Sequence, residues 1–165
     1  MKNLVLIGLP GCGKTTVGQR LAAELGLAFV DCDAEIEKRA GKTIPEIFSR
    51  EGEETFRELE SKALFTLLNT PGKVVSAGGG IVLKKANREV LRRATVVFLD
   101  REPNNIMLTC NLAGRPLMET CALAELAAQR RQLYLDCADH IVTAESIEEI
   151  TAEIVEYWRE GTCVF

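Results

Sequence analysis

The sequence predicts a three-layer α/β fold, in which a five-stranded parallel sheet carries helices on both faces. Two observations lead to this prediction. Short apolar runs alternate with segments of helical spacing along all 165 residues, and strands that alternate with helices are typical of parallel sheets. No repeat, low-complexity tract or linker interrupts this alternation, so we expect a single domain over residues 1–165.

Each expected element follows from its spacing and from its end signals. In the first helix, Val17, Leu21 and Leu25 recur at helical spacing, and Gly26 is a usual helix stop. A break is expected near Gly52 inside the longest helix. The expected strands cover residues 4–7, 28–30, 74–76, 95–99 and 140–143, and the expected helices cover residues 14–25, 34–40, 45–69, 85–93, 103–109, 121–137 and 147–159. Ligands bind such sheets at the carboxyl ends of the strands, so the residues that follow each strand are the first candidates for a site.

Composition and charge exclude several classes of protein. The chain is 47% hydrophobic and 27% charged, as in ordinary soluble globular proteins, and no apolar run approaches the ~20 residues of a membrane span. The net charge is −4 and the basic residues are scattered, whereas a nucleic-acid binder usually shows a basic stripe. The opening segment is too short for a signal peptide. We expect a cytoplasmic monomer with small-molecule partners, and neither nucleic acid nor membrane as a partner.

The six cysteines do not indicate a metal site. No pair has C-x-x-C spacing, and the single histidine, His140, cannot complete a zinc site with them. A cytoplasmic chain keeps its thiols reduced, so we expect small buried or half-buried thiols. The cysteines are at positions 12, 32, 110, 121, 137 and 163.

A phosphate-binding loop follows the first strand. Residues 8–15, GLPGCGKT, fit the pattern G-x-x-x-x-G-K-[ST], with a strand before them and a helix after. Its backbone N–H groups cradle phosphates, Lys14 reaches the β- and γ-phosphates, and the Thr15 hydroxyl binds Mg²⁺. The candidate nucleotide-binding residues are Gly11, Cys12, Gly13, Lys14, Thr15 and Thr16. GTPase switches, ATPases and small-molecule kinases all use this motif, so the rest of the site must decide the reaction.

Two aspartates follow the second strand. Asp31 and Asp33 are two residues apart, so an extended segment aims both side chains to one side, close to Lys14 and Thr15. One carboxylate can hold Mg²⁺ through water, and the other can orient or deprotonate an acceptor hydroxyl. Asp33 is equally suited to cap the helix that begins at Ala34. Asp31 has no such capping role and is the stronger candidate for the site.

The arginines differ in how strongly the sequence singles them out. Arg130 lies within the apolar stripe of its helix and needs an anion, either a substrate carboxylate or a core carboxylate in a structural salt bridge, whereas Arg131 points elsewhere, toward solvent. Arg57 lies in a charged stretch, where most charges are solvated. Arg115 lies in a segment with glycine and proline, over about 110–118, whose length suits a mobile lid. It is either an exposed loop arginine or a stabiliser of charge on a phosphoryl group in transfer.

In their order and spacing, these motifs resemble the shikimate kinase family over nearly the whole chain. Neighbouring gluconate and nucleotide kinases share the phosphate loop, but they would not be expected to carry the other motifs together. The motifs are GLPGCGKTT at 8–16, FVDCD at 29–33, GEETFRELE at 52–60, SAGGGIV at 76–82, GRPL at 114–117 and RRQLY at 130–134.

The resemblance implies a P-loop kinase fold with a substrate-binding helical insertion over about 33–61 and a short lid over about 110–118. It also implies roles for matching residues. Lys14 and Thr15 would bind the phosphates, Thr15 and Asp31 would bind the metal, and Arg115 would contact the phosphates from the lid. Asp33 would contact the shikimate hydroxyls, and Arg57 and Arg130 would bind the shikimate carboxylate. The backbone would approach the substrate closely at Gly78, Gly79 and Gly80.

Two positions depart from the family pattern. Gln132 stands where the family usually has proline, and residues 107–111 lack the arginine that stacks on adenine in many relatives.

The implied activity is ATP-dependent phosphorylation of the 3-hydroxyl of shikimate to shikimate 3-phosphate, a step of aromatic amino acid biosynthesis. Lys14, Asp33 and Arg115 would be catalytic, with Mg²⁺ as cofactor and ATP as co-substrate. The alternatives are another small-molecule kinase, of gluconate or nucleotide type, and a nucleotide-binding module without catalysis.

Overall fold

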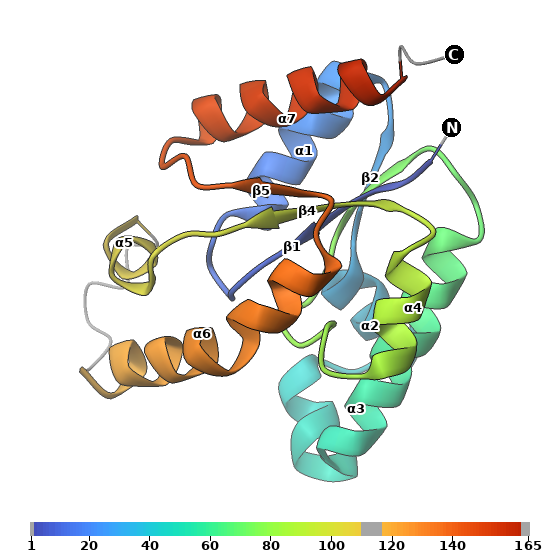
Figure 1. Cartoon of the computed structure of the whole chain (residues 1–165). Helices are drawn as coiled ribbons and strands as arrows, with labels where there is room; N and C mark the ends of the chain where they lie inside the picture. Colours follow the sequence, from blue (N-terminus) through green and yellow to red (C-terminus); the bar gives the residue numbers. More distant parts are fainter. Residues whose placement is uncertain (1, 110–116, 163–165) are drawn as a thin grey trace.

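A computed structural model of the chain describes residues 2–109 and 117–162, with side chains at 2–108 and 122–161. Its centre is a five-stranded sheet in the order β2-β3-β1-β4-β5, in which every neighbouring pair is parallel (Figure 1). The prediction of a five-stranded parallel sheet is thereby confirmed. The strands are β1 (Leu4–Ile7), β2 (Ala28–Asp31), β3 (Lys73–Ser76), β4 (Thr95–Leu99) and β5 (His140–Val142).

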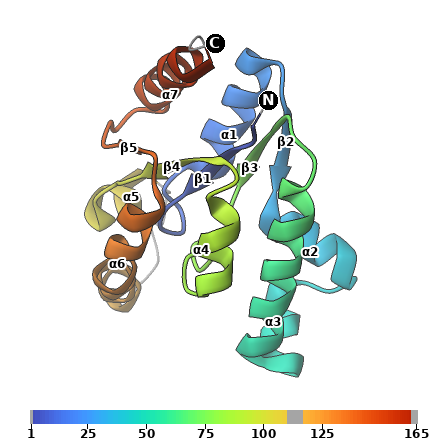
Figure 2. The same cartoon turned by 45° about the vertical axis from the view of Figure 1, so that its right-hand side comes forward.

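Helices cover both faces of the sheet, which confirms the three-layer arrangement. On one face lie α1 (Lys14–Leu25) and α7 (Ile147–Thr162), and on the other lie α3 (Ile44–Leu68), α4 (Lys85–Leu91) and α6 (Leu117–Cys137) (Figure 2). Two shorter helices, α2 (Cys32–Ala40) and α5 (Pro103–Thr109), follow β2 and β4. None of the helices in the described ranges is long and apolar enough to cross a bilayer.

The main core is built on the central strand. All four residues of β1 are fully buried, because helices cover this strand on both faces. Full burial of each such aliphatic side chain contributes about 1.5–3 kcal/mol relative to exposure. The loop that follows β1 is therefore attached to the most firmly held strand of the molecule.

A second, smaller core lies between α2 and α3. It consists of Ile36, Ile47, Phe56 and Ala63, and it is separate from the main core; we call it the α2–α3 cluster. The predicted break in α3 is confirmed, because Gly52 has non-helical dihedrals (φ 85°, ψ 168°) that favour glycine. This break lets the first turns of α3 turn back and pack on α2.

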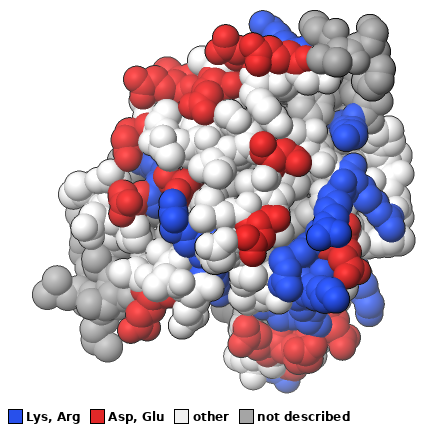
Figure 3. Space-filling model, in the orientation of Figure 1, with Lys and Arg blue, Asp and Glu red and all other residues white. Residues whose placement is uncertain are grey.

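Charged side chains are unevenly distributed over the surface. Lys and Arg gather over α4 at the lower right of Figure 3, whereas Asp and Glu follow α7 along the top. Several basic residues at α4 serve local packing: Lys84 pairs with Glu54 at 2.7 Å, and the Arg93 guanidinium lies 5.6 Å from the centre of the Phe65 ring. This basic region therefore joins α4 to α3.

Candidate active site

The phosphate loop connects the centre of the sheet to α1. Gly13 has a positive φ of 99° at the N-cap, and α1 begins at Lys14. The Lys14 ammonium donates hydrogen bonds to the carbonyl oxygens of Gly8 (2.9 Å) and Leu9 (2.8 Å), so the buried side chain is curled over its own loop. The loop thus presents its backbone N–H groups and one ammonium at the carboxyl end of β1.

A cleft of about 420 Å³ joins the phosphate loop to the ends of β2 and β3. Among its lining residues are Gly11, Gly13, Lys14, Thr15, Thr16, Asp31, Asp33, Gly78 and Gly79. Cys12, predicted to bind nucleotide, is fully buried, and its Sγ lies 3.6 Å from the Lys14 Nζ. Its side chain is therefore turned away from the cleft, and only its backbone can serve the loop.

Asp31 has a capping role that the sequence did not predict. Its Oδ1 accepts hydrogen bonds from the backbone N–H groups of Asp33 (3.0 Å) and Ala34 (3.2 Å), so Asp31 is the N-cap of α2. The expectations that Asp31 has no such role and that Asp33 could be the cap are wrong. Asp31 is still extended (φ −95°, ψ 123°), and helical geometry begins at Cys32. The cap fixes the carboxylate so that its other oxygen, Oδ2, accepts a hydrogen bond from the Thr15 hydroxyl at 2.9 Å.

Three oxygen-bearing side chains meet at this point. The Ser76 hydroxyl, at the end of β3, lies 3.5 Å from the Thr15 hydroxyl, which contacts Asp31. Among the described side chains there is no group of three or more His, Cys, Asp or Glu suited to a metal ion. Mg²⁺ in phosphate sites needs only one or two carboxylates, because phosphate oxygens and water complete its shell. The oxygen donors present here fit that requirement.

A group of charged side chains surrounds Gly78. Arg57 Nη1 pairs with Glu60 Oε2 at 2.8 Å, and Glu60 is 1% exposed. Within the described part of the chain, Asp33 Oδ1 and Glu60 Oε1 are buried without a hydrogen-bond partner. A Cβ atom at Gly78 would lie 2.8 Å from Glu60 Oε1 and 2.9 Å from Asp33 Oδ1. Glycine at this position therefore leaves both carboxylates room at the cleft.

The next two glycines lie close to Pro10, Arg130 and Arg57. A Cβ at Gly79 would lie 3.0 Å from Pro10 Cδ, with Arg130 Nη1 in ordinary contact at 3.5 Å, and a Cβ at Gly80 would overlap the Arg57 guanidinium. Neither glycine has a positive φ, so space and not backbone conformation calls for glycine here. Residues predicted from four separate motifs, Asp33, Arg57, Gly78–Gly80 and Arg130, are thus brought together. Of this group, Asp33, Gly78 and Gly79 line the cleft. We call the group, with Glu60, the substrate end of the cleft, and residues 8–15 with Asp31 the phosphate end.

Arg130 is held on α6 one turn before Tyr134. The buried Tyr134 hydroxyl donates a hydrogen bond to the Gly79 carbonyl at 2.5 Å and so fixes the glycine segment against α6. Among the described residues, Arg130 Nε is buried without a hydrogen-bond partner. Arg131 points outward as predicted, but it pairs with Asp100 at 2.7 Å.

Burial changes the acidity of the two carboxyl groups at the substrate end. It raises the pKa of Asp33, and the neighbouring Asp31 charge raises it further, although Lys14 opposes the change. Burial also raises the pKa of Glu60, against the hydrogen bond from Arg57. Asp33 is therefore a better proton acceptor than an exposed aspartate.

Sequence reasoning missed three residues of this region. Glu60 lies in a charged stretch that looks solvated, Tyr134 looks like one more apolar residue of the α6 stripe, and Ser76 is simply the last residue of a strand. The signal for Ser76 was its place at a strand end beside the glycines. The predicted lid covers about 110–118. Residues 110–116, with Arg115, lie outside the described residues, and the side chains of residues 117 and 118 are not described.

Comparison with known proteins identifies the family. A model of the shikimate kinase family matches residues 10–159. The shikimate kinase of Symbiobacterium thermophilum is 40% identical over 96% of this chain and 97% of its own. Among solved structures, a shikimate kinase from Acinetobacter baumannii in complex with shikimate aligns with a TM-score of 0.90 at 33% identity, covering 99% of this chain and 96% of the other. A gluconokinase from Sinorhizobium meliloti aligns at 0.57 with 20% identity, covering 92% and 88% of the two chains, and shares the fold alone. The chain belongs to the shikimate kinase family.

Proposed function

We propose that this protein transfers the γ-phosphoryl group of ATP to the 3-hydroxyl of shikimate, giving shikimate 3-phosphate and ADP. One observation carries the choice of substrate. At the substrate end, two buried carboxylate oxygens and one buried guanidinium N–H lack partners among the described residues. Carboxylates accept hydrogen bonds from hydroxyl groups and arginines bind carboxylates, so the site is complementary to a hydroxylated carboxylic acid. The relative that was solved with shikimate supports the same ligand.

The phosphate end supplies charge stabilisation. Lys14 is placed to exchange the carbonyl oxygens of its loop for β- and γ-phosphate oxygens, and the N–H groups of Gly13 and of the first turn of α1 bind the same phosphates. We propose that Thr15 and Asp31, with Ser76 nearby, hold Mg²⁺. When bound there, the ion would supply positive charge that offsets the negative charge of the phosphates. Thr16 lines the same part of the cleft.

The substrate end orients the nucleophile. Asp33, whose pKa is raised by burial, accepts the proton of the 3-hydroxyl. The hydroxyl oxygen bonds to the γ-phosphorus as the bond to the β–γ bridging oxygen breaks, and ADP leaves with that oxygen. Arg57 and Arg130 hold the substrate carboxylate, and backbone at Gly78–Gly80 lies beside the ring. Arg115 neutralises the transferring group from the lid.

A turnover assay with three acceptors tests this proposal. ADP release is followed with shikimate, gluconate or a nucleoside monophosphate, and the product of the shikimate reaction is located by NMR. We expect turnover with shikimate alone and phosphate on the 3-oxygen. Turnover only with another acceptor would assign a different kinase, and ATP binding without any turnover would assign a non-catalytic module. Asp33→Asn is the matched variant, because it keeps the shape of the side chain and removes the proton acceptor.

We further propose that residues 1–165 form one kinase domain that acts as a cytoplasmic monomer. Both ends of the cleft come from one chain, so a second copy is not needed to complete it. The cysteines with described side chains, Cys12, Cys32 and Cys137, are free thiols, as suits a reducing compartment. Light scattering on the purified protein measures the oligomeric state directly.

A further inference from the structure

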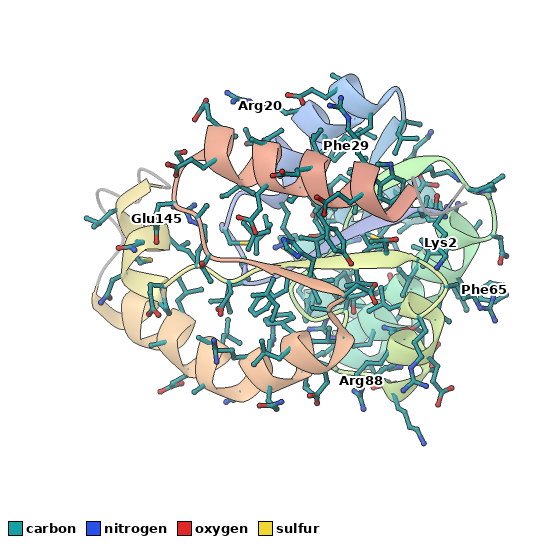
Figure 4. The ribbon with its side chains drawn as sticks, turned by 45° about the horizontal axis from the view of Figure 1, so that its top comes forward. Lys2, Arg20, Phe29, Phe65, Arg88 and Glu145 are labelled. Atoms are coloured by element: carbon teal, nitrogen blue, oxygen red, sulfur yellow. The ribbon has the colours of Figure 1, made fainter. Side chains whose placement is uncertain are left out.

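Arg101 lies directly beneath the phosphate loop, and neither the motifs nor the proposed mechanism assigns it a role. It follows β4, and its side chain is 4% exposed. Its Nη1 donates a hydrogen bond to the carbonyl oxygen of Cys12 at 3.4 Å, and its Nη2 pairs with Glu145 Oε2 at 3.4 Å. Figure 4 shows Glu145 on the connection between β5 and α7, beside α5. Asn105 of α5 donates to the other oxygen of Glu145 at 2.9 Å.

The position of this charge differs from that of the exposed arginine pairs. In Arg131–Asp100 and Arg20–Glu148 the arginine side chain is 57% and 47% exposed, so solvent screens both pairs. In the Arg101–Glu145 pair the Glu145 side chain is 53% exposed, whereas the Arg101 side chain is buried. The positive charge is thus held away from water and beneath the loop, where it acts with less screening.

The carbonyl that Arg101 contacts belongs to a peptide group whose other end faces the cleft. The Cys12 carbonyl and the Gly13 N–H form one peptide unit, and Gly13 lines the cleft with Lys14 and Thr15. A cation on the carbonyl polarises the peptide and strengthens its N–H as a donor. We propose that Arg101 is a positioning residue for the nucleotide phosphates, which acts through the Cys12–Gly13 peptide. This inference rests on the proposed function, because it requires nucleotide phosphates at the loop.

If Arg101 acts on the phosphates, its removal should weaken the binding of ADP but not the binding of adenosine. In Arg101→Met, a side chain of similar length without charge, we expect ADP to bind up to about tenfold more weakly, the effect of weakening one backbone hydrogen bond to phosphate. Adenosine, which lacks phosphates, should bind as it does to the unchanged protein. Arg101→Lys keeps the charge without the planar fork, and about a threefold loss for ADP is expected. Arg131→Met is the matched control, because it removes an arginine that pairs with Asp100, next to Arg101 in the sequence, and whose hydrogen bonds among the described residues go to Asp100 and not to the loop.

Calorimetry with ADP and ligand-observed NMR with adenosine give the two readouts, and circular dichroism verifies the fold of each variant. Unchanged ADP affinity in Arg101→Met, or an equal loss for ADP and adenosine, would overturn the proposal and leave Arg101 a structural role. If Arg101→Met does not fold, Arg101→Lys decides by the same comparison. Failure of the unchanged protein to bind ADP would instead contradict the proposed function.

Discussion

The two ends of the cleft are built in different ways. The phosphate end is mostly one run of eight residues, 8–15, on the most buried strand, and it relies on backbone N–H groups and one lysine. The substrate end collects charged side chains from α2, α3 and α6 around the glycine backbone after β3, and its charges balance one another. The phosphate end should therefore depend on single groups, whereas the substrate end should respond to any change in the balance of charge.

The largest effect is expected at the phosphate end. Lys14→Ala should lower turnover by about a thousandfold or more, because it removes the ammonium that meets the phosphoryl group in transfer. The fold should persist, since among the described residues the ammonium is hydrogen-bonded to two carbonyl oxygens of its own loop and to the Cys12 thiol. Steady-state assays and circular dichroism measure the two effects. Lys85→Ala, at an exposed position of α4, is the control, and near-normal turnover in Lys14→Ala would disprove the assignment.

At the substrate end, the pair of Arg57 with Glu60 should matter for stability as well as binding. Arg57→Met leaves a buried carboxylate without its partner, and the free energy of unfolding should fall by about 3 kcal/mol at neutral pH. Arg39→Met, which breaks an exposed pair on α2, should cost about 0.3–0.5 kcal/mol.

The pH dependence of the Arg57→Met variant gives a sharper test. Arg57 lowers the pKa of Glu60 against burial, so its removal raises that folded-state pKa further above the unfolded value. Below the ordinary Glu pKa both states are protonated and no cost arises. As pH rises toward the raised pKa, the unfolded state ionises first, so stability falls. Urea titrations should show a larger deficit at pH 8 than at pH 5, and an equal deficit would contradict the role of Glu60.

Arg130→Lys should weaken shikimate binding and leave ATP binding unchanged. An ammonium cannot reproduce the planar fork of the guanidinium, and the loss of one charge-assisted contact costs about 1.5–3 kcal/mol. Titration calorimetry with each ligand measures both affinities. If shikimate affinity is unaltered, Arg130 serves a structural ion pair, which was the alternative drawn from the sequence.

The smallest expected effect is a displaced pH profile. Because burial and the charge of Asp31 raise the pKa of Asp33, kcat/KM for shikimate should fall on the acid side at a pH above the ordinary Asp value of about 3.9. Activity is present above this raised pKa and lost below it. A profile that stays flat down to pH 4, with the fold intact, would show that Asp33 is not the proton acceptor.

The same contrast explains what could be predicted from the sequence. The phosphate-loop motif and the alternation of apolar runs with helical segments are local patterns. They were enough to predict the phosphate loop and the parallel sheet. Arg57 was selected only by family resemblance, because its neighbours in the sequence are charged and its partner Glu60 looks equally solvated. Their burial depends on packing between α3 and the glycine segment, which no local pattern encodes. Asp31 was misjudged for a similar reason, since one carboxylate both caps α2 and contacts Thr15.

The separate α2–α3 cluster should make one part of the molecule less stable than the rest. Its four buried side chains do not join the main core, so α2 and the first turns of α3 should open at a lower free energy than the sheet. Arg57 follows Phe56 of the α2–α3 cluster, and Arg130 extends from α6, whose Tyr134 belongs to the main core. A carboxylate gripped by both arginines would tie the weaker part to the stronger one. Amide hydrogen exchange over residues 32–51 should then slow when shikimate binds, while exchange in β1 and β4 stays the same.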